Sequence, residues 1–228
     1  MKGTNNQLTL EEIEQRNDYG SRPCYPELVA IILAGALHVA VEVLMSPSAA
    51  QMYNVVVSLG FLAYLGWRAT STKNVFRIWG MRSDNIWTAL HFQLRFGAVA
   101  VLLIFGFGLV TGSLHLPLTF WLTLGLYPLW GIAQQFALQN LIAKNLSGFL
   151  SHPVAIACAS ALLFGMAHYP RGVLVLATIL AGFFFTLIYQ RFPNLWAVGF
   201  VHGILGALVF YIVLGEDPGA EILGFLLR

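Results

Sequence analysis

The stretch Gln134-Gln135-Phe136-Ala137-Leu138-Gln139 lies inside a long apolar run, Leu118–Ala143. If this run crosses a membrane, each amide without a hydrogen-bond partner costs several kcal/mol. The three Gln side chains therefore need polar partners elsewhere in the bundle, and His168 and His202, each in a later apolar run, are the obvious candidates. Polar groups at membrane depth usually face a bundle interior or a water-filled cavity. We therefore expect the functional site at this cluster.

The composition supports a membrane location for this run. Of 228 residues, 58% are hydrophobic and 10% are charged, and the mean hydropathy is +0.74. Soluble domains carry about 25% charged residues, so the chain is expected to be an integral membrane protein. A net charge of +2 is too small to indicate nucleic-acid binding. The two cysteines, Cys24 and Cys158, predict neither a disulfide framework nor a zinc site.

Seven apolar runs predict the fold class. Most approach the roughly 20 residues that a helix needs to cross a bilayer. We therefore expect an all-α polytopic membrane protein with about seven transmembrane helices and an intramembrane polar cavity formed by runs four, five and seven. The runs are Leu28–Met45, Ala49–Trp67, Phe96–Gly112, Leu118–Ala143, Pro153–Tyr169, Gly172–Gln190 and Leu195–Leu214.

Charge placement predicts the orientation. If all seven runs cross, the basic segment Arg68–Arg95, Lys144 and Arg191 lie on one side, while the opposite loops carry little positive charge. The positive-inside rule then places the N-terminus in the cytoplasm and the C-terminus outside. The segment Asn74–Leu94 mixes aromatic and basic residues, so it can lie on anionic lipid or serve as a solvated connector.

The chain divides into three parts on composition. Residues 1–27 form a polar N-terminal leader, and residues 28–214 form the transmembrane domain, with its core motifs in 118–214. Residues 215–228 form a short acidic tail. The leader contains several acidic residues, unlike the basic n-region of a cleavable signal.

The two histidines lie in recognisable local patterns. His168 ends Phe164-Gly165-Met166-Ala167-His168, and His202 follows Gly199 in Gly199-Phe200-Val201-His202-Gly203. The spacing Gly199-x-x-x-Gly203 predicts that another helix approaches closely beside His202.

These motifs resemble the type II CAAX prenyl endopeptidases and their bacterial relatives, the CPBP or ABI membrane proteins. The family signature is Glu-Glu-x-x-x-Arg, then Phe-x-x-x-His, then His-x-x-x-Asn or Asp. Phe76–Arg82 and Asn194-Leu195-Trp196 are also similar to family segments, and the bacterial relatives imply a prokaryotic-type inner membrane. In this chain the three motifs read Gln134–Gln139, Phe164–His168 and His202–Gly206, in the same order and spacing.

The resemblance implies an intramembrane endopeptidase in which a glutamate and the second-motif histidine activate water. The third motif then stabilises the oxyanion. Here His168 and His202 are retained, but Gln134 and Gln135 replace both glutamates. An amide has no proton-accepting carboxylate, so Gln134 cannot act as general base. The remaining altered positions are Gln139 in place of Arg and Gly206 in place of Asn.

Losing arginine together with glutamate is coherent, because a buried cation without its carboxylate is an uncompensated charge. Glycine at position 206 lacks the side-chain donor that the family motif has there, and loss of one oxyanion donor typically lowers the catalytic rate roughly 10²–10³-fold. We therefore expect a homologue of intramembrane endopeptidases that binds, rather than cleaves, a membrane-anchored or lipidated peptide or protein. Its other expected partners are membrane lipids.

Three alternatives remain open from sequence. The chain could be an active endopeptidase that uses His168 and His202, with Glu42 supplying the missing carboxylate. Glu42 could instead pair with His38 or an arginine, and the two histidines could serve only as interhelical hydrogen-bond donors. A small transporter lined by the same side chains is a third reading, although no inverted repeat is evident. No cofactor is predicted, and two histidines among neutral amides lack a third strong zinc ligand.

Overall fold

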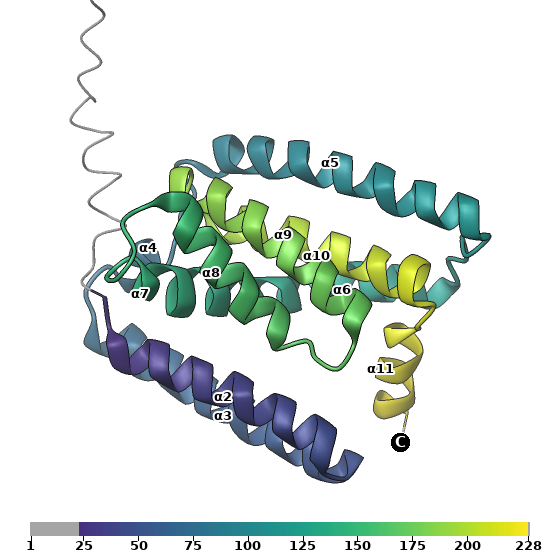
Figure 1. The fold of residues 1–228 in the computed structure, drawn as a ribbon, viewed down its shortest axis with the longest axis horizontal. Coiled ribbons are helices and arrows are strands. Elements are labelled where there is room, and N and C mark those ends of the chain that lie inside the picture. Colours follow the sequence, from purple (N-terminus) through teal and green to yellow (C-terminus); the bar gives the residue numbers. More distant parts are fainter. Residues whose placement is uncertain (1–22, 228) are drawn as a thin grey trace, which may run out of the picture.

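A computed structural model describes residues 23–227, which form helices and connecting turns with no strand among them (Figure 1). The predicted leader lies mostly outside these residues. Prolines occupy the first turn of several helices, where the missing N–H has no intrahelical acceptor. The helices are α2 (Tyr25–Leu44), α3 (Pro47–Ser71), α4 (Val75–Ile78), α5 (Ile86–Thr111), α6 (Leu118–Phe136), α7 (Lys144–Leu146), α8 (Pro153–Met166), α9 (Gly172–Arg191), α10 (Leu195–Leu208) and α11 (Pro218–Leu226), with π-helical segments η1 (Ala137–Ala143) and η2 (Val209–Leu214).

The all-α prediction is confirmed, but the number of spans is confirmed only in part. Within residues 23–227, five helices are long and apolar enough to cross a membrane: α2, α3, α5, α9 and Leu195–Leu214. Two of the seven runs fall short. Run four contains Pro128 and the Gln side chains, which lower the hydropathy of α6, and run five gives only the 14 residues of α8.

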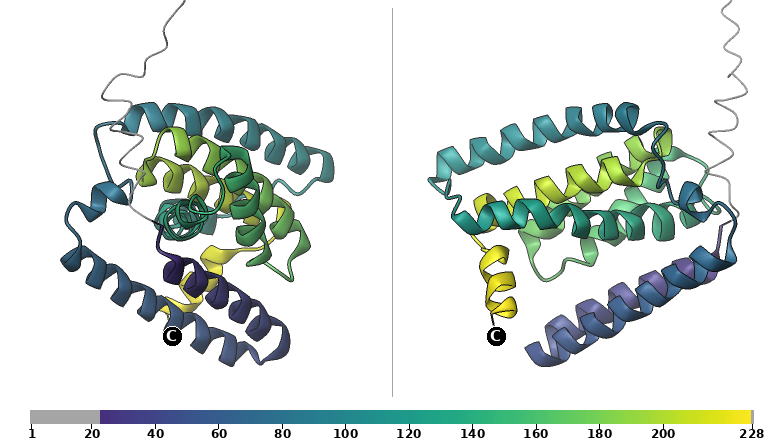
Figure 2. Two further views of the ribbon diagram at one scale, coloured as in Figure 1. Left: turned by 60° about the vertical axis from the view of Figure 1, so that its left-hand side comes forward. Right: turned by 180° about the vertical axis from the view of Figure 1, so that it is seen from behind.

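The helices form a bundle with α10 at its centre. Figures 1 and 2 show α5, α6, α9 and α10 running alongside one another, while the α2–α3 hairpin diverges from them toward its tip. The hairpin packs on the core through the halves of its helices nearer α7, and the ring of Phe61, close to the middle of α3, meets that of Phe136. Its two arms are joined by a hydrogen bond from the Tyr53 hydroxyl to the carbonyl of Ala34.

Glycines bring α6 and α10 into backbone contact, as the Gly199-x-x-x-Gly203 spacing predicts. A Cβ on Gly203 would lie 2.5 Å from Cα of Pro128, and one on Gly199 would lie 2.6 Å from Cα of Ile132. On the facing helix, a Cβ on Gly131 would lie 2.4 Å from the carbonyl oxygen of Gly199. No side chain fits at these positions, so the glycines fix the separation of the two helices that carry the polar cluster.

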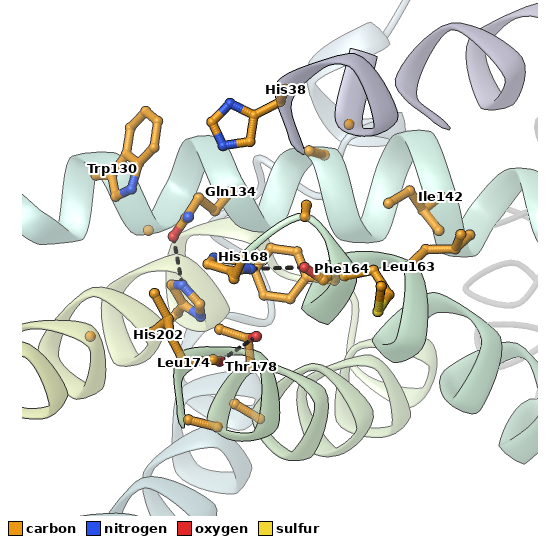
Figure 3. Close-up of a pocket in the computed structure, with 18 of the residues that line it drawn as sticks. His38, Trp130, Gln134, Ile142, Leu163, Phe164, His168, Leu174, Thr178 and His202 are labelled. Carbon is orange, nitrogen blue, oxygen red and sulfur yellow. Dashed lines mark hydrogen bonds between the residues drawn. The ribbon is translucent and has the colours of Figure 1, made fainter. Parts of the chain in front are cut away.

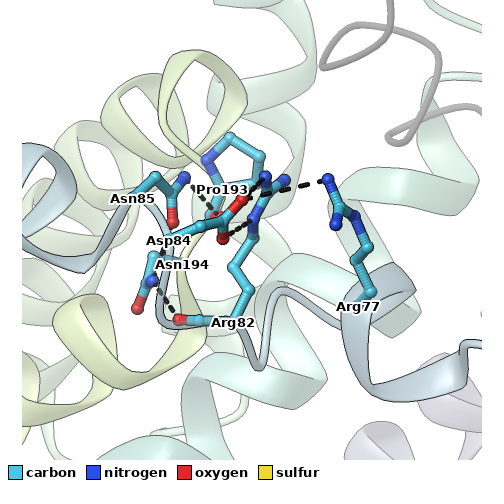
Figure 4. A network of polar contacts seen from close by, with 6 residues as sticks. All are labelled: Arg77, Arg82, Asp84, Asn85, Pro193 and Asn194. Atoms are coloured by element: carbon cyan, nitrogen blue, oxygen red, sulfur yellow. Dashed lines mark hydrogen bonds and ion pairs between the residues drawn. The ribbon is translucent and has the colours of Figure 1, made fainter.

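The segment before α5 locks onto the start of α10 (Figure 4). Asn194 caps α10 by accepting from the backbone N–H of Ala197 (3.0 Å), and its amide donates to the carbonyl of Arg82 (2.7 Å) and to Asn85. The backbone N–H of Leu195 donates to the carbonyl of Gly80 (2.8 Å). The two flanking stretches noted in the sequence, Phe76–Arg82 and Asn194–Trp196, therefore meet here in a structural junction.

Gly80 is required at this junction by its backbone conformation and by the lack of space for a side chain. Gly112, which follows α5, shares only the backbone conformation. Both have a left-handed backbone, with φ of +73° and +70°. A Cβ on Gly80 would lie 2.3 Å from the hydroxyl of Tyr189, whereas one on Gly112 would have open space around it.

We predict that Gly80→Ala lowers the unfolding midpoint in detergent clearly more than Gly112→Ala. Both variants carry the left-handed strain, about 1–2 kcal/mol, and only Gly80→Ala adds the clash with Tyr189. Equal losses in the two variants would show that the junction does not constrain the fold.

Asp84 gives the same junction an acid sensitivity. The Arg82 guanidinium donates from Nε (2.6 Å) and Nη2 to the Asp84 carboxylate, and this hydrogen bonding, opposed by partial burial, lowers the pKa of Asp84 to about 2. A depressed carboxyl pKa contributes stability above the unfolded value of 3.8 that is lost as the pH falls toward 2.

We predict that stability falls less steeply between pH 3.8 and pH 2 in Asp84→Asn than in the wild type, measured as unfolding midpoint against pH. The difference should be small, because the side chain is 52% exposed; parallel curves would contradict it.

Candidate functional site

His202 of α10 joins two of the three glutamines. Its Nε2 lies 2.8 Å from Oε1 of Gln134, and its Nδ1 lies 3.1 Å from Nε2 of Gln135. Both amides are on α6, and the side chain of His202 is buried between the helices, 8% exposed. The structure thus brings together the amides and one of the two imidazoles that the sequence singled out.

The chain of hydrogen bonds continues to α9. Nε2 of Gln139 donates to Oε1 of Gln135 (2.9 Å) and approaches Oγ1 of Thr186 (3.2 Å). Because Oε1 of Gln135 accepts this bond, its Nε2 faces His202 as a donor, and Nδ1 of His202 must accept. The proton of His202 then lies on Nε2 and is donated to Gln134. The hydrogen bonds from Gln139 through Gln135 and His202 to Gln134 therefore all run in one direction, with each residue donating to the next.

His168 lies beside this chain without joining it through a direct hydrogen bond in the described structure. Its Nδ1 donates to the carbonyl of Phe164 (2.8 Å), one turn earlier at the end of α8. The Phe164 ring contacts both imidazoles, with centroids 4.9 Å from His168 and 5.9 Å from His202. Figure 3 shows His168, Gln134 and His202 around the same pocket.

The pocket has a volume of about 840 Å³ and lies between the α2–α3 hairpin and the bundle. It differs from the expected polar cavity, because most of its lining is apolar and the polar groups are few. The hairpin supplies one wall, including Gly35 and Val57, and the rest comes from α6, η1, α8 with the turn that follows it, α9, α10 and η2. The divergence of the hairpin creates this space, which motif reasoning on α6, α8 and α10 could not reveal.

Two other predicted site residues occupy different positions. Gly206 lines the main pocket, and a Cβ there would meet Tyr127 at an ordinary 3.6 Å, so the site has room for a side chain. Glu42 lies instead at a separate pocket of about 200 Å³, which His168 also borders. The expected partner of Glu42, His38, has its Nδ1 3.1 Å from Oδ1 of Asn54.

Sequence reasoning missed Thr186, which is fully buried and ends the hydrogen-bond chain. A single threonine in an apolar helix carries no signal of its own, since its hydroxyl can bond to its own helix. Oε1 of Gln139 is buried without a partner among the described residues. Within residues 23–227, no group of three His, Cys, Asp or Glu side chains could hold a metal ion.

We predict that His202→Ala destabilises the protein more than His168→Ala. Removing His202 leaves the carbonyl of Gln134 and the buried amide N–H of Gln135 without a partner, at about 1–3 kcal/mol per group. Removing His168 frees only one carbonyl, at the end of its own helix. Unfolding midpoints in detergent provide the measurement, and a smaller loss for His202→Ala would contradict this geometry.

Comparison with protein families gives one match. Residues 116–208 match the family described as Type II CAAX prenyl endopeptidase Rce1-like, and the matched range contains all three motifs. Comparison with curated proteins and with solved structures finds no match. The match covers less than half of the chain, and together with the apolar helices it supports membership of the CAAX-protease-like membrane proteins.

Proposed function

We propose that this protein binds a lipid-anchored peptide in the pocket and does not cleave it by glutamate-dependent hydrolysis. The observation that carries the proposal is the hydrogen bond between Nε2 of His202 and Oε1 of Gln134. Gln134 is a neutral amide at the position where the family motif has a glutamate. An amide oxygen that accepts from His202 has no basicity with which to activate water. Capture and hydrolysis are separable, because binding groups act without the base.

The shape and lining of the pocket support the binding part. The apolar lining suits a lipid chain, and the few polar groups gather at Gln134, His168 and His202. Small-molecule sites commonly combine a mostly apolar wall with a small number of placed polar groups. A lipid chain and the peptide next to it would occupy these two kinds of surface.

The membrane placement is part of the same proposal. We propose that α6 and α8 also cross, giving seven spans over residues 28–214, with the N-terminus cytoplasmic and the C-terminus outside a prokaryotic-type inner membrane. Figure 1 shows α4 and α7 at one end of the bundle and α11 at the other. The first end carries Lys73, Arg77 and Lys144, as the positive-inside rule requires of a cytoplasmic face.

A second function has one observation in its favour. Glu42 and His168 border the same small pocket, so a carboxylate is near the retained histidine. An active endopeptidase could use this pair to activate water in place of the family glutamate. Glu42 does not line the main pocket, whereas Gln134 and His202 do, and this separation favours the binding function.

A cleavage assay with membrane-anchored peptides and purified protein distinguishes the binding function from the active endopeptidase. We predict that the wild type releases no more product than His168→Ala or Glu42→Gln. Turnover that is lost in His168→Ala would overturn the binding-only proposal.

Restoring the family residues tests where the site lies. We predict measurable cleavage by the variant that combines Gln134→Glu, Gln135→Glu, Gln139→Arg and Gly206→Asn, because a carboxylate base, its counter-charge and an oxyanion donor return together. The same variant with His168→Ala is the control. A folded four-residue variant without activity would contradict the assignment of these positions as the altered catalytic site.

A further inference from the structure

The main pocket has no Asp, Glu, Lys or Arg side chain among its described lining residues. Its polar members are neutral amides, hydroxyls and indole or imidazole groups, including Asn54, Ser58 and Thr178. An ionised ligand group placed beside Gln134 would therefore have no carboxylate, ammonium or guanidinium counter-charge in the lining. A charge removed from water without a partner is strongly disfavoured, so the pocket selects against ionised groups.

Gln134 presents a hydrogen-bond donor to the pocket. Its Oε1 accepts from His202, and the polarity of the Gln139–Gln135–His202 chain fixes this orientation. Its Nε2 has no hydrogen-bond partner among the described residues, although Gln134 lines the pocket. The two N–H bonds of this amide are thus available to a carbonyl oxygen of a ligand.

His168 presents the complementary acceptor. Its Nδ1 donates to the carbonyl of Phe164, so in the neutral imidazole the lone pair of Nε2 remains free. His168 lines the same pocket as Gln134 (Figure 3). The pocket therefore offers one neutral donor and one neutral acceptor within an apolar surround.

We propose that the polar end of the ligand is an intact secondary amide, and that a free carboxylate is rejected. The amide carbonyl accepts from Nε2 of Gln134, and the amide N–H donates to Nε2 of His168. This inference rests on the proposed binding function and narrows its ligand to an uncharged peptide group attached to a lipid chain. A carboxylate has no N–H for His168 and brings a charge that the lining does not balance.

Three probes that differ only in their C-terminal group test this selection. Each is an N-dansyl-S-farnesylcysteine ending in an N-methyl amide, a methyl ester or a free carboxylate, so that the C-terminal group is the only carboxamide, ester or carboxylate in the probe. Binding to the full chain in nanodiscs is followed by energy transfer from tryptophan to dansyl, with empty nanodiscs as the blank. The ester keeps the neutral carbonyl and lacks the N–H, so it separates the two hydrogen bonds.

We expect the amide to bind most tightly, the ester more weakly, and the carboxylate at least about tenfold more weakly than the amide. In His168→Ala the amide and ester should bind equally, because the acceptor for the N–H is gone. Gln134→Glu should lose amide affinity, since it replaces the donor with an anion. Gln51→Glu, an exposed position outside the pocket lining, is the matched control and should bind as the wild type does.

The outcomes distinguish failure of the selection for a neutral amide from failure of the proposed binding function. Carboxylate binding equal to or tighter than amide binding overturns the selection for a neutral amide, while the binding function stands. Equal affinities of amide and ester in the wild type overturn the role of His168. Failure of all three probes to bind above empty nanodiscs overturns the proposed function, and this inference with it. The wild-type series alone decides these outcomes if a variant does not fold.

Discussion

The hydrogen bonds from His202 to Gln134 and Gln135 are the constraint on which the rest of the structure depends. Amides inside apolar helices must be paired, and they can be paired across helices only if those helices lie close together. The contacts of Gly131, Gly199 and Gly203 provide that closeness. The glycines that bring α6 and α10 together therefore lie close to the amides and the imidazole that must be paired.

The cluster is chemically consistent as a neutral site. Where the family motif has two carboxylates and a guanidinium, this chain has three amides, and they form a chain of hydrogen bonds that ends on Thr186. Replacing only one of these groups would leave a buried charge or an orphaned donor. The three amides together form a connected network of neutral groups, which is consistent with the proposed binding function.

The sequence could predict the parts of this arrangement that follow from spacing and polarity. Gln135 and Gln139 are four residues apart, a spacing that places two side chains on one helix face, and the Gly199-x-x-x-Gly203 spacing predicts a close helix contact beside His202. Both features are present. Features that depend on three-dimensional packing could not be predicted. No periodicity indicates the π-helical segment η1 after Phe136, or the divergence of the α2–α3 hairpin that opens the pocket.

Other differences have local causes. The acidic tail contains helix α11, which Asp217 caps while it also accepts from Thr119 and from Tyr211. Composition alone marks such a segment as polar and gives no sign of these partners. The apolar run Pro153–Tyr169 predicts a longer helix than α8, which ends at Met166 and leaves His168 in the following turn.

The protonation of His202 tests the central claim most directly. Nitrogen-15 NMR of histidine-labelled protein in lipid, with His202→Ala to assign the signal, distinguishes the two neutral tautomers and the imidazolium. The account predicts a neutral ring at neutral pH, protonated on Nε2 and accepting on Nδ1, and it predicts that Gln135→Ala perturbs the Nδ1 signal. A charged ring, or a proton on Nδ1, would contradict the polarity from which the binding function and the ligand selection are derived.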